Sequence, residues 1–491
     1  MARRAGKLTL FFHRVRDFVT RPPVICDPGV SAVEVARLLS REGIGSVLVT
    51  GKDGAPAGIV TDRDLRRKVV AGNRDATATR AADIMSAPLI TIPATAFAFE
   101  AILEMTRREI HHLAVSEEGR VVGVVSSHDF LWLQAAHPVT LAREIGQAAS
   151  LEALAKPAER VTGLVRRLVE EGGTAYDVAQ IVAELNDRIV TRVLGLVTAG
   201  LGAAGEAAPP VPYCWLAFGS EARREQTLRT DQDNGLVYAN APAELAPRAA
   251  AYYARLAADA IRALVSLGFP VCEGDFMASN PHWCQPASTW AGYFRRWMGE
   301  PTPEQVLAAC IFFDVRPIAG APELGAALRT LLQEEAPSQR VFLRLLARDV
   351  ADHRVPLTLF GNVAVPRRGP RRGRVDIKMA GSLQLVGAAR LHALALGLGA
   401  TNTIDRFRAA AARGVYHDDE VREVTDAYQH LTRLRIVHQL EQAADSTPMD
   451  NDVDPKRLTR ADRLLLRDAL KTVTHVQASI RERFATALVG G

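Results

Sequence analysis

The sequence is short of cysteine, of lysine and of long apolar runs, and each shortage argues against a class of protein. Its five cysteines are odd in number and no two of them form a Cys-x-x-Cys pair, so neither a zinc ribbon nor a disulfide framework is indicated. The most apolar run, residues 189–204, contains Arg192 and several glycines, so we expect no membrane-spanning helix. Reduced thiols and the lack of a spanning segment together predict a cytoplasmic protein.

The charge of the chain does not indicate a nucleic-acid-binding protein. The net charge is +5, but only seven of the 60 basic residues are lysines, and the arginines are interleaved with acidic residues along the chain. Hydrophobic residues make up 48% of the sequence, which is enough for well-formed cores. A length of 491 residues predicts three or four domains.

An internal repeat occupies the first third of the chain. The sequence G-I-V-T-D-R-D-L at residues 58–65 returns as G-V-V-S-S-H-D-F at residues 123–130, a period of about 65 residues. Each copy reads as strand, helix, strand, strand and closing helix. The expected helices cover residues 32–42 and 99–109, and the strands that follow them cover residues 46–50 and 112–115.

This repeat resembles a tandem pair of cystathionine-β-synthase (CBS) domains, which commonly bind adenosine nucleotides as regulatory ligands. The resemblance implies that a hydroxyl and a carboxylate three residues later face the ligand. These residues are Thr61 and Asp64 in the first copy, and Ser126 and Asp129 in the second. The same residues could instead only cap the following helices, as aspartate does well. The resemblance also implies a homodimer formed through residues 21–140.

A second pattern combines a tight turn with two carboxylates. The apolar run C-W-L-A-F at residues 214–218 reads as a buried strand that ends at Gly219 and Ser220. Asp231 and Asp233 follow at a spacing of two, which places both carboxylates on the same face of a strand. Such a pair attracts a hard divalent cation. A turn that presents backbone N–H groups binds phosphate. The pattern therefore predicts the chemistry of nucleotidyl transfer.

Residues 219–233 resemble the signature of polymerase β-type nucleotidyltransferases. They read G-S-E-A-R-R-E, then four further residues, then T-D-Q-D. They are most similar to the uridylyl- and adenylyltransferases that regulate bacterial nitrogen metabolism. The resemblance implies that Asp231 and Asp233 bind Mg²⁺ or Mn²⁺. It also implies that Gly219 and Ser220 bind the outer phosphates of a nucleoside triphosphate, with help from Arg223. One departure is Ala222, where relatives usually have glycine.

Nucleotidyltransferases of this type carry a third carboxylate on the strand after the next helix. Here a helix is expected over residues 247–267, and we interpret residues 271–277 as the strand that follows it. Asp275 is therefore our candidate for the third metal ligand and catalytic acid. Glu273 and Asp314 remain alternatives.

From residue 303 onward the spacing of apolar residues is helical. This part resembles the C-terminal substrate-binding domain of a bacterial family that joins CBS pairs to a nucleotidyltransferase. Two motifs look like those of that family: D-I-K at residues 376–378 and L-R-I-V-H-Q at residues 434–439. Lys378 is a candidate nucleotide-binding residue, because lysine binds phosphate as a point charge.

The expected fold class is multidomain, with α/β and all-α parts: a tandem CBS pair (βαββα), a polymerase β-type nucleotidyltransferase domain and a C-terminal helical bundle. The expected boundaries are an N-terminal extension at 1–20, CBS domains at 21–80 and 81–140, a helical connector at 141–210, the nucleotidyltransferase domain at 211–300 and the helical domain at 301–491.

Two functions fit this organisation. The first is a Mg²⁺-dependent nucleotidyltransferase that modifies a hydroxyl, such as one on a protein, and is regulated by adenine nucleotides bound to the CBS pair. The second is a catalytically inert protein that senses nucleotides and signals through a partner. Both predict nucleotide binding, and only the first predicts release of pyrophosphate.

Overall fold

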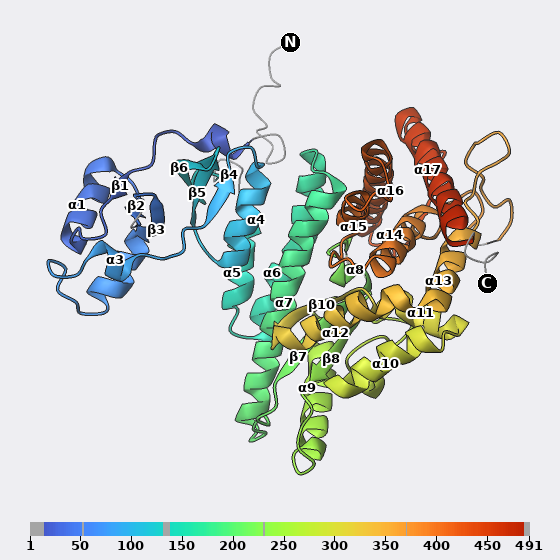
Figure 1. Cartoon of the computed structure of the whole chain (residues 1–491), viewed down its shortest axis with the longest axis horizontal. Coiled ribbons are helices and arrows are strands. Elements are labelled where there is room, and N and C mark those ends of the chain that lie inside the picture. The colour runs from blue at the N-terminus through green and yellow to red at the C-terminus, as the bar shows by residue number, and fades with distance from the viewer. Residues whose placement is uncertain (1–13, 52–53, 131–137, 229–230, 370, 486–491) are drawn as a thin grey trace. The chain divides into compact units, whose positions relative to one another are not determined.

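The computed structural model describes residues 14–51, 54–130, 138–228, 231–369 and 371–485 (Figure 1). The chain divides into two compact units. The first comprises residues 1–143 with 171–173, and the second comprises residues 144–170 with 174–491. Within the described ranges, no helix is both long enough and apolar enough to cross a membrane.

The first unit contains two three-stranded sheets of identical topology. In each sheet the first two strands are parallel and the second and third are antiparallel. The strands are β1 (Ile25–Cys26), β2 (Ser46–Thr50) and β3 (Pro56–Thr61) in the first sheet, and β4 (Thr91–Pro93), β5 (His112–Glu117) and β6 (Arg120–Ser126) in the second. The predicted internal repeat is therefore confirmed.

Residues at the helix ends determine where the helices of the repeat begin and end. Helix α1 (Ala32–Glu42) begins after Ser31, whose hydroxyl accepts a hydrogen bond from the backbone N–H of Glu34, and it ends at Gly43 in the left-handed conformation. Its counterpart α4 (Ala98–Arg108) lies one residue before the predicted range. The shorter helical segments of this unit are η1 (Val15–Phe18), α2 (Asp62–Asp64), η2 (Leu65–Val70) and α3 (Ala81–Ile84), and α5 (Pro138–Gln147) follows the second repeat.

The second unit is built on one four-stranded sheet in the order β10-β7-β8-β9. Strand β7 (Tyr213–Phe218) is antiparallel to both of its neighbours, β8 (Asn234–Tyr238) and β10 (Val315–Gly320), and β8 is parallel to β9 (Cys284–Pro286). The two strands expected on either side of the Gly-Ser turn are thus adjacent in space.

Helices cover this sheet. Helix α7 contacts β10 and α9, and α12 contacts β10 and β7. Two long helices are separated at residues 171–174, where Gly172 has a positive φ and Thr174 caps the second helix. The helices of this part are α6 (Leu151–Glu170), α7 (Ala175–Ala203), α8 (Gly219–Ala222), α9 (Ala246–Ser266), η4 (Pro281–Trp283), α10 (Ala287–Gly299), α11 (Pro303–Phe312) and α12 (Pro322–Glu335).

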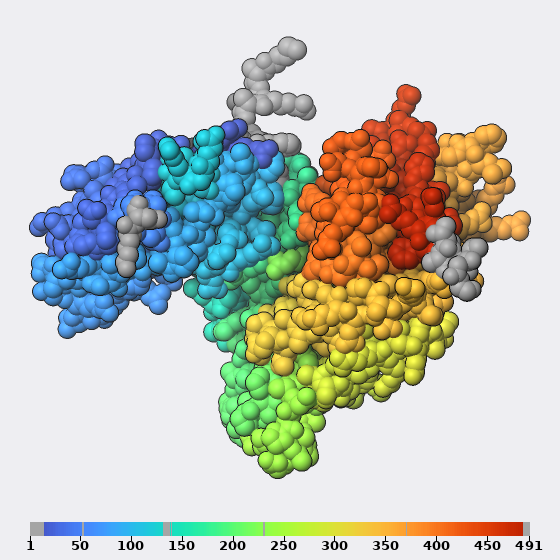
Figure 2. All heavy atoms as spheres, in the orientation of Figure 1, coloured from blue at the N-terminus to red at the C-terminus, as the bar shows by residue number. Residues whose placement is uncertain are grey.

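The C-terminal part is helical, as predicted, and it shares a hydrophobic core with the sheet. That core runs without interruption from Phe218 and Trp290 beside the sheet to Leu431 and Leu470 in the last two helices. In Figure 2 the gold atoms of α12 and α13 lie directly against the orange helices that follow. The elements are η5 (Ala336–Ser338), α13 (Arg340–Asp352), η6 (Lys378–Ser382), α14 (Leu383–Ala395), α15 (Thr403–Ala411), α16 (Asp418–Ala444) and α17 (Arg460–Ala485), with a small sheet of β11 (Val375–Asp376) and β12 (Asp452–Val453).

Two strand predictions are wrong. Asp231 and Asp233, which were expected on a strand, lie in irregular backbone just before β8. Residues 271–277 form turns and irregular backbone, and the strand that pairs with β8 is β9, about ten residues later. The reason is local, because Asp275 has a φ of 55° and follows Gly274, so the chain turns where an extended strand was expected.

Candidate functional site

A polar pocket lies where β7 ends, between the sheet and the C-terminal helices of the second unit. It joins the Gly-Ser turn and both predicted metal-binding carboxylates to side chains from η6, α14 and α16. The pocket is lined by Ser220, Arg223, Glu225, Asp231, Asp233, Lys378, Ser382, Leu383, Val386, Tyr428 and Arg435.

The turn and the second carboxylate are held in close contact. The backbone N–H of Phe218 donates to the carbonyl oxygen of Asp233 at 2.8 Å, so the end of β7 is fixed to the start of β8. Gly219 has a φ of +53°, and a Cβ atom there would lie 2.7 Å from Oδ2 of Asp233. Glycine suits this position, because its left-handed backbone carries no strain and because a Cβ atom would force the carboxylate of Asp233 to shift.

The two carboxylates differ in their surroundings. Asp231 is exposed to solvent, whereas Asp233 is half-buried and lies 3.5 Å from the thiol of Cys272, which donates to its Oδ1. Burial raises the pKa of Asp233 to about 6. A cation bound at Asp233 would offset this desolvation, so the site favours a positively charged ligand.

The predicted third carboxylate does not join this pair. Asp275 is exposed on its turn, where its carboxylate accepts a hydrogen bond from Asn280 Nδ2 at 2.9 Å and its carbonyl oxygen accepts one from Trp283 Nε1. Glu273 is also exposed and is not among the residues that line the pocket. In the part of the chain that the structure describes, no three His, Cys, Asp or Glu side chains are grouped closely enough to hold a metal ion.

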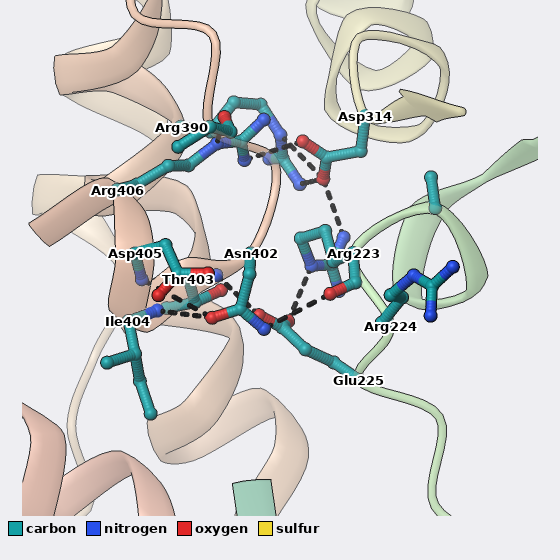
Figure 3. Close-up of polar contacts among 12 residues, drawn as sticks. Arg223, Arg224, Glu225, Asp314, Arg390, Asn402, Thr403, Ile404, Asp405 and Arg406 are labelled. Atoms are coloured by element: carbon teal, nitrogen blue, oxygen red, sulfur yellow. Dashed lines mark hydrogen bonds and ion pairs between the residues drawn. The ribbon is translucent and has the colours of Figure 1, made fainter. Parts of the chain in front are cut away.

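Asp314, the other alternative, is fully buried in an ion-pair network (Figure 3). Its carboxylate lies 2.6 Å from each of three guanidinium groups, those of Arg223, Arg390 and Arg406. Although burial by itself would raise it, these ion pairs hold the pKa of Asp314 well below its usual range. Three cations already surround this carboxylate, so it offers no room for a metal ion.

The same network fixes the signature residues that follow the turn. Arg223 also pairs with Glu225 at 2.7 Å. Glu225 in turn accepts a hydrogen bond from the backbone N–H of Thr403 at the start of α15, and Asn402 Nδ2 donates to the carbonyl oxygen of Arg223 (Figure 3). Arg223 lines the pocket, as predicted from the sequence, but its guanidinium already holds two carboxylates. It therefore anchors the turn to the helical part of the unit.

Two carboxylates and a phosphate-binding turn fit a magnesium ion that is shared with a substrate. Mg²⁺ in nucleotide sites is held by one or two carboxylates and takes its remaining oxygens from phosphates and water. Asp231 and Asp233 supply such a pair beside Ser220, and Gly219 has no Cβ atom that would displace the Asp233 carboxylate. The residues present therefore fit this ion without a third protein carboxylate.

The CBS candidates make the same local hydrogen bonds in both repeats, and in the first repeat these bonds cap helix α2. The carboxylate of Asp64 accepts from both the hydroxyl and the backbone N–H of Thr61, at 2.7 and 3.0 Å, and it also pairs with Lys68 at 2.8 Å. In the second repeat, Asp129 accepts from the hydroxyl and the N–H of Ser126 at 2.8 and 2.6 Å. Capping is therefore present in the structure, and contact with a ligand stays a prediction.

Sequence comparison assigns families to most of the chain. Residues 15–71 and 81–135 match the CBS domain family. Residues 159–304 match the family described as "Putative nucleotidyltransferase DUF294", and residues 340–484 match the family described as "Putative nucleotidyltransferase substrate binding domain". The chain belongs to this CBS-linked nucleotidyltransferase family. The segment predicted as a connector, residues 141–210, falls largely within the range matched to the nucleotidyltransferase.

Relatives with a name or a structure match parts of the chain. An uncharacterized protein of Methanopyrus kandleri is 33% identical over 132 residues, which cover 27% of this chain and 67% of that protein. The mitochondrial CBS domain-containing protein CBSX3 of Arabidopsis thaliana is 29% identical over 21% of this chain, and the match spans about half (52%) of that protein. A solved CBS domain protein from Pyrobaculum aerophilum, complexed with AMP, is 30% identical over 27% of this chain and 99% of that chain, with a TM-score of 0.24.

Several residues at the site could not be identified from the sequence. Arg390, Arg406 and Arg435 lie on helices in a chain with many arginines, and nothing in their spacing distinguishes them from arginines on the surface. The one available signal was the L-R-I-V-H-Q motif, which contains Arg435.

Proposed function

We propose that this protein transfers a nucleotidyl group from a nucleoside triphosphate to a hydroxyl group, with Mg²⁺ or Mn²⁺ bound by Asp231 and Asp233. The observation that carries the proposal is the pocket in which Ser220, Asp231 and Asp233 lie together beside Gly219, where a Cβ atom would displace the Asp233 carboxylate. Bound Mg²⁺ would neutralise charge on the triphosphate and lower the pKa of the acceptor hydroxyl.

The residues of the chain would orient the reactants. Ser220 and the backbone of the turn would bind the outer phosphates, and Lys378 would bind them from the helical side of the pocket. The acceptor oxygen would then form a bond to the α-phosphorus as the bond from that phosphorus to the β-phosphate oxygen breaks. Pyrophosphate leaves and the hydroxyl proton passes to solvent.

The acceptor would dock on the C-terminal helical domain, since residues 340–484 match a substrate-binding domain. A protein hydroxyl such as a tyrosine is our candidate acceptor, by analogy with the nitrogen-regulatory transferases that the motif resembles. The CBS pair would bind an adenosine nucleotide near Thr61, Asp64, Ser126 and Asp129, regulate the transferase and form a homodimer through residues 21–140.

A specific observation favours the second candidate function, an inert nucleotide sensor. Strand β9, which pairs with β8 just after the Asp-x-Asp motif, consists of Cys284, Gln285 and Pro286 and offers no carboxylate for a second metal ion. Binding of a triphosphate with one metal ion needs only Asp231 and Asp233. Transfer that depends on two metal ions would need a third acid.

Labelled triphosphates distinguish the two functions. The protein is incubated with each α-labelled triphosphate, Mg²⁺ and a host lysate, and both labelled protein and released pyrophosphate are measured. The proposal predicts both products, and predicts that Asp231→Asn combined with Asp233→Asn abolishes them while the variant stays folded. Binding of triphosphate with no pyrophosphate from any of them would establish the sensor instead.

A further inference from the structure

Arg435 is a buried cation that has no carboxylate partner. Only 9% of its surface is exposed, and burial lowers the pKa of its guanidinium. Its Nε donates to Oδ1 of Asn451 at 2.9 Å, which is a neutral acceptor. Among the described residues, Arg435 makes no direct ion pair with an Asp or Glu oxygen. Asp376 and Glu225 act on its charge only from farther away, and burial outweighs their effect on its pKa.

The other buried arginines of this unit are all paired. Arg223, Arg390 and Arg406 share the carboxylate of Asp314 at 2.6 Å (Figure 3). A buried charge without a counter-ion costs several kcal/mol, so a chain retains one where a ligand supplies the opposite charge. Arg435 is thus the buried guanidinium that is left for a ligand.

Helix α16 presents Arg435 to the nucleotide pocket. Tyr428 and Arg435 are seven residues apart, which places them on the same face of the helix, and both line the pocket with Ser220. One turn further along, Oε1 of Gln439 accepts a hydrogen bond from the backbone N–H of Leu228, in the segment that leads to Asp231. The helix is therefore fixed to the strand region that carries the carboxylates.

The charges of the pocket show which ligand needs these cations. Asp231 and Asp233 alone would repel a triphosphate. Lys378 and Arg435 lie on the opposite side of the same pocket and offset the two negative charges. With Mg²⁺ at the carboxylates, the pocket carries excess positive charge, which suits the phosphate chain of a nucleotide.

We propose that Arg435, together with Lys378, binds the outer phosphates of the triphosphate opposite Ser220. The phosphate chain then bridges the nucleotidyltransferase sheet and the helical substrate-binding domain, and the site selects triphosphates over monophosphates by charge. This inference rests on the proposed function only in taking this pocket as the nucleotide site, and it holds for an enzyme and for an inert sensor alike.

Calorimetric titration with inorganic tripolyphosphate and Mg²⁺ tests the proposal on the full chain. This probe has no adenosine and so does not report on the CBS pair. Arg435→Met is expected to weaken binding by about tenfold or more, which corresponds to about 1.4 kcal/mol. Arg435→Lys keeps the charge and should weaken it less. Arg413→Met, at an exposed arginine of the same domain, is the matched control and should bind as the wild type does.

Thermal unfolding without ligand separates this role from a structural one. If Arg435 is an anion-binding residue, Arg435→Met removes a buried charge that has no direct ion pair. The variant without ligand should then melt at the wild-type temperature or above it. Wild-type affinity in Arg435→Met, a marked fall in its apo melting temperature, or no binding of tripolyphosphate by the wild type would each overturn the proposal. Binding that depends on Arg435 without pyrophosphate release from any triphosphate would leave it standing and would reject nucleotidyl transfer.

Discussion

Gly219 and Asp233 are packed so closely that a methyl group on the glycine would lie 2.7 Å from Oδ2 of the carboxylate. This contact joins the two halves of the signature motif, which are separated by 14 residues in sequence. The phosphate-binding turn and the metal-binding carboxylate therefore cannot move independently, and a change at one alters the geometry of the other.

Gly219→Ala should weaken triphosphate binding without unfolding the protein. The new Cβ would push Asp233 out of place, so we expect the affinity for Mg²⁺-tripolyphosphate to fall by about tenfold or more. The left-handed backbone should add a loss of about 1–2 kcal/mol in stability. The matched control is Gly205→Ala, because Gly205 has a φ of +84° and a methyl group added there would meet no atom within 4 Å. Equal affinity in the two variants would show that the contact with Asp233 is unimportant.

Asp314→Asn should destabilise the second unit severely. The guanidinium groups of Arg223, Arg390 and Arg406 would stay buried, but their shared carboxylate would be replaced by a neutral amide. Breaking a buried ion pair costs about 3–5 kcal/mol. The control is Asp352→Asn, which breaks an exposed pair with Arg348 and should change the free energy of unfolding by less than about 1 kcal/mol. Four of the five tryptophans, residues 215, 283, 290 and 297, lie in this unit, so fluorescence during urea unfolding provides the measurement.

His392 should make the second unit less stable in weak acid. Its ring is buried, its Nε2 has no hydrogen-bond partner among the described residues, and burial lowers its pKa to about 4. Between pH 4 and the unfolded pKa of about 6.5 the unfolded chain binds a proton that the folded chain does not, so stability falls as the pH drops through this range. The full loss by pH 4 is on the order of 3 kcal/mol.

His392→Phe is the variant that isolates this effect. Phenylalanine can keep the edge-to-face contact with Tyr416, whose ring centre lies 5.2 Å from that of His392, and it does not titrate. The difference in unfolding free energy between wild type and variant, measured at pH 7.5 and at pH 5, should grow toward acid in favour of the variant. A difference that does not change with pH would mean that His392 titrates normally in the folded protein.

Asp64 and Asp129 allow the ligand role to be separated from capping. Alanine at both positions removes the carboxylate that accepts hydrogen bonds from Thr61 or Ser126 and should cost about 1 kcal/mol or more at each, whereas asparagine keeps an acceptor oxygen and should cost less. If the CBS pair binds adenosine nucleotides through these carboxylates, millimolar AMP should raise the melting temperature of the wild type. It should not raise that of Asp64→Asn combined with Asp129→Asn. A full shift in the asparagine variant would assign both residues to capping alone.

The repeat, most of the helices and the chemistry of the turn could be predicted from the sequence, because each of these depends on residues close together in the chain. Helix α1 follows from Ser31, Glu34 and Gly43, which lie within thirteen residues. The strand expected at Asp231 and Asp233 begins only at Asn234, so the spacing of two does not place these carboxylates on a strand face. The strand expected over residues 271–277 also fails, because the chain turns at Asp275, where a single positive φ outweighs the apolar pattern.

Which charged residues lie next to one another could be learned only from the folded chain. Asp314 lies 91 residues from Arg223 and 76 from Arg390, and Arg435 reaches a pocket whose carboxylates lie some 200 residues earlier. No local pattern identifies such partners, since an arginine that pairs, one that binds phosphate and one in solvent look alike on a helix. Burial distinguishes them, because a charge removed from water must be matched by another charge, and the fold determines where that charge comes from.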